Sequence, residues 1–409
     1  MKSGQKYLSI GGFKNSFAGI FLVANTFIWF LYSCRLLSAV TVNSTFSNSQ
    51  VTLIWSMTVF GTVVASVFGF YLSNMAKTKE TFIRYWLIAG IFLSLLPIVI
   101  DPAAFSHLTV FFSLVGVYFG LGMPVSLAYF ALSTKETNRS RLGGVTFLAI
   151  FIGVIFLGVL GITDTGLNGL VLATVKTVGL AVFLKIKPNL NPASDRKDVS
   201  YGQVFKNKTF LLYFVPWTMF SIANYIALPI VNQLVSNLPG LFETSMMVEN
   251  IIAGVFAVVS GFLADRFGRR RIVLLGFILL GLGYASLGLF AENIIGWWFY
   301  TAVDGVAWGI FYTIFLMTIW GDIAFVKNSE KYYAIGYLPF LFSILTELSI
   351  GSAISTTINS TAIFSFTSLF LFIAVLPLAY APETLPLQIL KNRELQSYIK
   401  KAQRAKDSG

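Results

Sequence analysis

The chain has 409 residues, of which 56% are hydrophobic and only 11% are charged, and its formal net charge is +12. A soluble protein carries about a quarter charged residues, so most of this chain has no need to face water. Cys34 is the only cysteine and His107 the only histidine. This count excludes an intramolecular disulfide, a cysteine or histidine metal site and a catalytic histidine pair. We therefore expect no metal, no cofactor and no enzyme activity.

Apolar runs long enough to cross a membrane recur along the whole chain. A helical span needs about 20 residues, because a rise of about 1.5 Å per residue must cover about 30 Å of hydrocarbon. The runs are too long for barrel strands, which makes helix the expected element. We expect twelve spans, near residues 16–40, 51–73, 82–101, 106–132, 143–163, 167–186, 210–235, 244–264, 272–291, 294–320, 334–356 and 361–381.

Basic residues gather in alternate loops of this twelve-span arrangement. The intervening loops 41–50, 161–168 and 236–249 contain no Lys or Arg. Positive charge marks the cytoplasmic side, so both termini are expected in the cytoplasm, with the protein in the plasma membrane. Because the charge is divided among short loops, it indicates contact with anionic lipid headgroups and argues against a nucleic-acid partner.

The longest polar interruption, residues 185–208, divides six spans from six. Gly69-Phe70 after span 2 and Gly261-Phe262 after span 8 are related by an offset of about 192 residues. Repeated halves are a recurring architecture of secondary transporters. The fold class expected is an all-α membrane protein of two pseudo-symmetric six-helix bundles. Its parts would be the bundles 1–184 and 209–381, the cytoplasmic linker 185–208 and a basic cytoplasmic tail 382–409.

After span 8 the chain reads Gly261-Phe262-Leu263-Ala264-Asp265-Arg266-Phe267-Gly268-Arg269-Arg270. This segment resembles the signature loop of the major facilitator superfamily, G-x-L-A-D-R-x-G-R-R/K, at the expected place between spans 8 and 9. The resemblance implies a transporter in which this loop is a conformational latch. Gly261 would let two helices approach, Asp265 would pair with a cation or accept from a helix N-terminus, and Gly268 would permit a tight turn.

Asp322, at the cytoplasmic end of span 10, is the predicted partner of Arg269 or Arg270, with Arg266 in the same basic cluster. We expect this pair to be partly solvated and worth about 1 kcal/mol. The corresponding first-half loop, residues 69–79, lacks the acid and the Gly-Arg-Arg end. We therefore expect the inner gate of the first half to lack the usual charge pair.

Two further sequence features bear on the substrate of such a transporter. Pro382-Glu383-Thr384 after span 12 resembles the P-E-T end signature of sugar porters, although Leu385-Pro386 stand where that group has Lys-Gly. Drug/proton antiporters carry a Gly-Pro-x-x-Gly-Gly element in span 5 and an arginine early in span 4, and neither occurs here. The resemblance favours a sugar or an organic acid as the substrate.

Ionisable groups inside a span cost several kcal/mol unless they are paired or hydrated, so they are candidate functional groups. Apart from those at the span ends, five qualify, namely Arg35, Lys176, Glu249, Asp304 and Glu347. Arg35 would meet an anionic substrate group, an acid or the lipid interface. Asp304 and Glu347 would carry a coupling proton, because burial favours a neutral carboxyl group. Lys176 is a further candidate for the substrate or ion pathway, and Glu249 is interpreted as structural.

Span 7 is unusually polar for a membrane helix. Asn224, Tyr225, Asn232 and Gln233 supply hydrogen-bond donors and acceptors, in a pattern that resembles the polar span-7 positions of sugar porters. In span 10, Trp308 would stack on a sugar ring or serve in packing.

The sequence thus predicts a monomeric secondary active transporter that moves a small organic solute by alternating access, with protons as a possible coupling ion. It carries no G-x-x-x-x-G-K-S/T element for ATP hydrolysis. Two alternatives remain open. One is an efflux transporter for amphipathic compounds, which the aromatic-rich spans would suit, and the other is a non-transporting membrane sensor on the same fold.

Overall fold

The computed structural model describes residues 3–186, 199–236, 241–290, 293–324 and 329–386, together with residues 395 and 403. Within these ranges the chain contains helices and no strand. Twelve of the described helical segments are long and apolar enough to cross a membrane. They coincide with the twelve predicted spans apart from shifts at their ends, so the fold class expected from the sequence is confirmed.

The first half contains six spanning helices. Their ends follow local sequence signals: Ser47 and Gln50 form a capping box at the start of the second helix, and Thr78 caps the third. A short 3₁₀ turn, which contains Pro97, ends the third helix, since proline lacks the donor that an α-helix needs. The elements are α1 (Ser3–Val42), α2 (Asn48–Met75), α3 (Lys79–Leu95), η1 (Leu96–Ile98), α4 (Phe105–Ser133), α5 (Arg139–Val159) and α6 (Thr165–Ile186).

The second half begins with a short linker helix and continues with six spans. Span 10 is interrupted in its middle by a π-helical segment, η2. The elements are α7 (Tyr201–Lys206), α8 (Lys208–Ser236), α9 (Leu241–Phe267), α10 (Arg269–Phe290), α11 (Ile294–Phe311), η2 (Tyr312–Thr318), α12 (Ile319–Ile323), α13 (Ser329–Thr357) and α14 (Ser360–Tyr380). Residues 187–198 of the predicted linker, and most of the predicted tail, lie outside the described residues.

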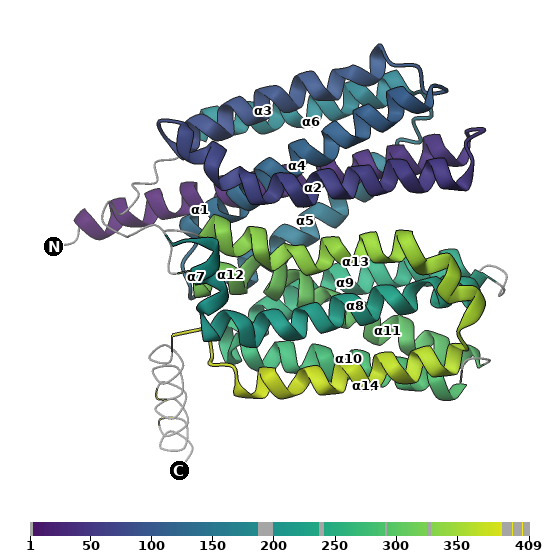
Figure 1. Cartoon of the computed structure of the whole chain (residues 1–409). Helices are drawn as coiled ribbons and strands as arrows, with labels where there is room; N and C mark the ends of the chain where they lie inside the picture. Colours follow the sequence, from purple (N-terminus) through teal and green to yellow (C-terminus); the bar gives the residue numbers. More distant parts are fainter. Residues whose placement is uncertain are drawn as a thin grey trace.

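The two bundles lie side by side (Figure 1), with α3 and α6 on the far side of one and α10 and α14 on the far side of the other. Between them, α5 packs on α9 and η2, and α13 packs on α2 and α4. Glycines permit the closest approach: a Cβ added to Gly261 of α9 would lie 2.5 Å from the carbonyl oxygen of Ser140. This close packing fixes the beginning of α5 against the end of α9.

The molecule has two ends, defined by its charges. The end that carries the starts of α5 and α10, with Arg139 and Arg269, is called the basic end, and the loops after α1 and α5 lie at the opposite end. Helix α1 begins and α14 finishes at the basic end (Figure 1). One buried apolar cluster fills the second half and extends to α1, α4 and α5, while another fills the first half.

Candidate functional site

At the basic end, Asp322 joins the two halves. Its Oδ1 accepts a hydrogen bond from Nη1 of Arg139 on α5, and its Oδ2 lies 3.1 Å from Nε of Arg269 on α10. All three side chains are at most 2% exposed. The expected pairing of Asp322 with Arg269 is present, but the expectation of a partly solvated pair is wrong. The bundles close over the carboxylate, and Arg139 supplies a second cation that the sequence did not indicate.

Asp265 provides a second bridge between the halves. Its carboxylate accepts hydrogen bonds from the backbone N–H groups of Ser140 (3.2 Å) and Arg141 (3.0 Å), at the first turn of α5. It also lies 3.3 Å from Nε of Arg141 and 3.4 Å from Nη2 of Arg269. A carboxylate at a helix N-terminus is stabilised by the helix dipole. Asp265 therefore both pairs with cations and caps a helix of the opposite half.

The turn between α9 and α10 depends on Gly268 and Glu383. Gly268 has φ +104°, a conformation that L side chains rarely adopt, and an added Cβ would collide with the Glu383 carboxylate. The same carboxylate accepts from the backbone N–H groups of Arg269 (2.8 Å) and Arg270 (3.2 Å). Arg270 donates to the carbonyl of Ala381 at 2.9 Å, away from Asp322. Glu383 thus caps α10 from the end of α14.

The exposed Arg266 lies apart from this network, with its guanidinium carbon 5.1 Å from the centre of the Phe267 ring.

The first-half loop, whose sequence lacks the usual charge pair, takes part in a different one. Lys79, at the start of α3, forms a salt bridge with Glu330 at the start of α13, and the Glu330 side chain is fully buried. Beside it, Nζ of Lys331 lies 3.9 Å from the centre of the Phe70 ring and donates to the carbonyl of Val199 at 2.8 Å. The pair links the two halves, so it could not be found by matching the loop to its second-half copy.

Nearer the middle of the membrane, aromatic side chains from both halves meet. Tyr312, the first residue of η2, stacks on Phe147 of α5 with ring centres 5.0 Å apart, and Trp308 stacks on Tyr312 at 5.0 Å. Phe340 of α13 lies between Trp308 (6.2 Å) and Tyr225 of α8 (5.6 Å). Two of the predicted residues, Tyr225 and Trp308, are therefore brought together. The contact of this group with Phe147 of the first half was not predicted. It depends on the π-helical segment, which has no reliable sequence signal.

The carboxylates of the second half lie in two different surroundings. Glu347 of α13 is half-buried and close enough to Tyr225 to interact electrostatically. Asp304 of α11 is buried among Glu249 and Tyr300, and its Oδ1 has no hydrogen-bond partner in the described chain. None of the ion pairs found in the described residues involves these acids. An ionisable residue inside a span is a candidate functional group.

The polar residues of span 7 do not share one surface. Asn224 is buried, and its Oδ1 accepts a 2.8 Å hydrogen bond from Tyr284 of α10, the helix on the far side of the second half. Asn232 and Gln233 are exposed near the end of α8, at the opposite end of the molecule. Of the predicted span-7 residues, Tyr225 alone lies at the aromatic junction described above.

Lys176 is enclosed inside the first half. It is fully buried on α6, and its Nζ lies 4.9 Å, 4.6 Å and 5.1 Å from the ring centres of Trp29, Trp86 and Tyr118. Its Nζ has no hydrogen-bond partner among the described residues. A cation–π contact is worth about 0.5–2 kcal/mol, and a lysine at the bilayer centre costs about 2.5–3.5 kcal/mol. Three rings therefore supply stabilisation of the same order as this cost.

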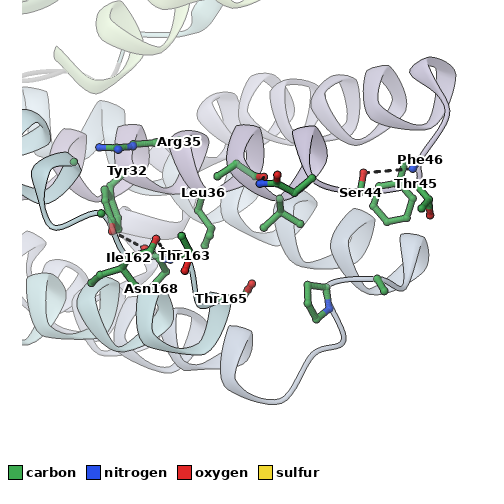
Figure 2. A pocket seen from close by; sticks show the side chains of 17 residues that line it. Tyr32, Arg35, Leu36, Ser44, Thr45, Phe46, Ile162, Thr163, Thr165 and Asn168 are labelled. Carbon is green, nitrogen blue, oxygen red and sulfur yellow. Dashed lines mark hydrogen bonds between the residues drawn. The ribbon is translucent and has the colours of Figure 1, made fainter.

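Arg35 lines a cavity of about 590 Å³ at the opposite end, formed by α1, α6 and the adjoining loops. At its wall, Tyr32 donates a 2.5 Å hydrogen bond to Oδ1 of Asn168 (Figure 2). Arg35 is exposed, lies against Gly158 of α5, and extends away from the Tyr32–Asn168 pair (Figure 2). An exposed guanidinium at this mouth is free to meet an anionic group.

Comparison with known proteins identifies the family. The model of the Major Facilitator Superfamily matches residues 16–320. The chain belongs to the Major Facilitator Superfamily. It is accordingly a membrane transporter and not an enzyme. No curated protein matches the sequence.

Solved structures of the superfamily share the fold. The chain is similar to the proton:xylose symporter XylE bound to 6-bromo-6-deoxy-D-glucose, with 15% identity, a TM-score of 0.64, and coverage of 92% of this chain and 97% of that chain. It is also similar to the E. coli fucose:proton symporter FucP, with 14% identity, a TM-score of 0.64, and coverage of 92% and 99%. FucP in the outward conformation gives 13% identity, a TM-score of 0.65, and coverage of 89% and 98%.

Proposed function

We propose that this superfamily member is a secondary active transporter of a small organic solute, a sugar or an organic acid, coupled to protons. The observation that carries the proposal is the joint between the halves. Buried ion pairs close the basic end, and the aromatic junction of Tyr312 and Phe147 lies farther into the membrane. A joint of paired charges can break and re-form in each cycle, as alternating access requires.

The solute would bind beside Tyr225 and Trp308. Aromatic rings offer flat faces for a sugar or another organic group, and the half-buried Glu347 beside Tyr225 would hold the coupling proton. Arg35, exposed at the cavity of the end opposite the basic end, would meet an acidic solute first. By the distribution of basic loops, the basic end would face the cytoplasm of a cell whose plasma membrane the protein spans as a monomer.

Uptake by the purified protein in liposomes tests this proposal. Radiolabelled xylose, fucose, glucose, lactate and succinate would be offered with and without an imposed pH gradient. We expect at least one to accumulate with the gradient and to be released by a protonophore. Binding without movement would favour a sensor.

The aromatic junction also favours a second candidate, efflux of amphipathic compounds, because its rings suit flat apolar solutes. Inverted vesicles offered an amphipathic dye from outside distinguish the two, because an efflux transporter would carry the dye into them. Proton-driven dye transport without movement of any sugar or acid would replace the proposed uptake by efflux.

A further inference from the structure

The cage around Lys176 is built for a cation, and it is held rigidly. Trp29 donates a 2.7 Å hydrogen bond to Ser94 of α3, and Trp86 donates a 3.0 Å hydrogen bond to the carbonyl of Tyr118. The rings of Trp29 and Trp86 each lie 4.8 Å from that of Tyr118. Gly122 leaves the space that Trp86 occupies, since a Cβ there would overlap the indole. Four helices, α1, α3, α4 and α6, therefore fix the three rings around one amine.

Two buried polar atoms without hydrogen-bond partners belong to residues that line the cage or bind the helix of Lys176. The Tyr118 hydroxyl and Oδ1 of Asn25 are both buried and make no hydrogen bond within the described chain. Asn25 donates to the carbonyl of Val175, next to Lys176, at 2.6 Å. An unpartnered buried polar group in a native interior requires an explanation, and a functional role or a bound water molecule is one. The cavity at the opposite end reaches Asn168, eight residues or about 12 Å along α6 from Lys176.

The groups that face Lys176 leave its charge unfixed. Trp29 comes from α1, Trp86 from α3 and Tyr118 from α4, and the Tyr118 hydroxyl is the ionisable group among them. Asn25 of α1 binds the backbone of the preceding residue, Val175. Among the described residues, none of the salt bridges includes Lys176, so no carboxylate pairs with it. A carboxylate partner would hold the amine charged, and a purely aliphatic pocket would hold it neutral. An aromatic cage does neither.

We propose that Lys176 is a proton-binding site of the first half, whose amine alternates between a neutral form and an ammonium ion held by Trp29, Trp86 and Tyr118. One proton joins the amine lone pair and one leaves it, so no further reactant is needed. Because the cage joins four helices, gain or loss of this charge changes the packing of the first half. Its role in the transport cycle rests on the proposed proton-coupled function.

Protonation of Lys176 can be followed without knowing the solute. The full-length protein in lipid nanodiscs would be titrated with pH while tryptophan emission is recorded, because an ammonium ion at 4.6–4.9 Å from two indole rings changes their emission. We expect a single-proton step in the wild type that Lys176→Met removes. Lys176→Arg, a permanent cation, should hold emission at the low-pH level across the range.

Tryptophan variants identify which indole rings respond to the protonation of Lys176. Trp29→Phe and Trp86→Phe should each remove about half of the step, whereas Trp55→Phe on α2 should leave it unchanged. Lys176→Gln provides a second neutral variant if the methionine variant does not fold, as judged by size-exclusion chromatography. A wild type without a Lys176-dependent step overturns the proposed site.

A second measurement distinguishes failure of the Lys176 site from failure of the proposed transport. Spin labels at Lys77 and Arg271, which are exposed on different halves at the basic end, would report the distance between the halves as pH is varied. We expect a pH-dependent shift that Lys176→Met abolishes. If the emission step is present but no solute moves in liposomes, the proton site stands and the transport proposal fails. If protons and solute move together without an emission step, the transport proposal stands and the site fails.

Discussion

Glu347 is the residue on which the proposed coupling most depends. It is half-buried on α13 beside Tyr225, and it belongs to none of the salt bridges among the described residues. An ionisable group at this depth is costly unless it is paired, hydrated or able to take up a proton. Its position near the aromatic junction places that proton beside the proposed solute site.

Glu347→Gln should abolish accumulation driven by a proton gradient while sparing exchange of solute across the membrane. The amide keeps the shape and hydrogen bonding of the carboxyl group but cannot carry a proton. For one proton per solute, a gradient of about one pH unit can drive about 10-fold accumulation; the variant should show none, with exchange within about twofold. Glu136→Gln, in the loop between α4 and α5, is the control. Equal loss of both activities would remove Glu347 from this role.

Gly268 carries the other residue-scale prediction. Because its φ of +104° and its contact with Glu383 exclude a side chain, Gly268→Ala should lower the free energy of unfolding by about 1–3 kcal/mol. The unfolding temperature in detergent measures this effect. Gly202→Ala in α7, where an added Cβ would make only an ordinary 3.9 Å contact with Oγ of Ser200, should leave that temperature unchanged or raise it. An unchanged unfolding temperature in Gly268→Ala would show that the turn relaxes to accept a side chain.

At the scale of elements, α10 depends on a residue far away in sequence. Glu383, beyond the end of α14, accepts from the first two backbone N–H groups of α10. These donors have no partner inside their own helix, and a carboxylate there also meets the positive end of the helix dipole. The resemblance to the P-E-T signature pointed to Glu383, but the contact itself required the folded chain.

Glu383→Ala should therefore loosen the start of α10 and no other helix. Loss of an N-terminal cap costs about 0.5–2 kcal/mol, which corresponds to about 2- to 30-fold faster exchange at the capped amides. Hydrogen–deuterium exchange with mass spectrometry would show this in peptides that cover Arg269 to Leu274, with peptides from α5 as the internal control. Unchanged exchange at α10 would show that water replaces the carboxylate at no cost.

Across the whole molecule, the described conformation is closed at the basic end by charges contributed from both halves. Asp322 receives Arg139 from the first half and Arg269 from the second, and Lys79 reaches across to Glu330. Removing one member of a buried pair leaves the other charge unpaired in a low dielectric. These contacts therefore set the balance between the closed and open forms of this end.

Asp322→Asn should shift the molecule toward the form open at the basic end. Breaking a buried pair costs about 3–5 kcal/mol, so the ratio of closed to open molecules should fall by more than about 100-fold. Pulsed electron resonance between spin labels at Lys77 and Arg271 would report a longer distance. Asp164→Asn, at the opposite end, should leave the distance unchanged. An unaltered distribution in Asp322→Asn would refute the latch.

The Lys79–Glu330 pair allows a charge-exchange test of the same joint. Lys79→Glu places a second acid beside the buried Glu330 and should open the basic end, since like charges repel there. The double variant Lys79→Glu/Glu330→Lys restores an opposite pair and should recover most of the closed population, measured with the same labels. If the double variant stays open, the two residues act separately.

The sequence by itself determined the membrane class, the twelve spans, the two halves and the family, because each depends on local or repetitive information. Hydrocarbon thickness fixes span length, and the loop from Gly261 to Arg270 keeps its residues in a fixed order. Individual candidates such as Asp322, Trp308 and Lys176 could also be found, since charged or large aromatic groups are conspicuous in an apolar span.

The tertiary structure alone decided which candidates meet. It placed Arg139 on Asp322, Lys79 on Glu330 and Tyr312 on Phe147, each pair contributed by different halves. It also separated Lys176 from the interface and enclosed it in a cage drawn from four helices. The physical reason is that these contacts arise where helices far apart in sequence pack together, and helical periodicity specifies a face but not the partner that covers it.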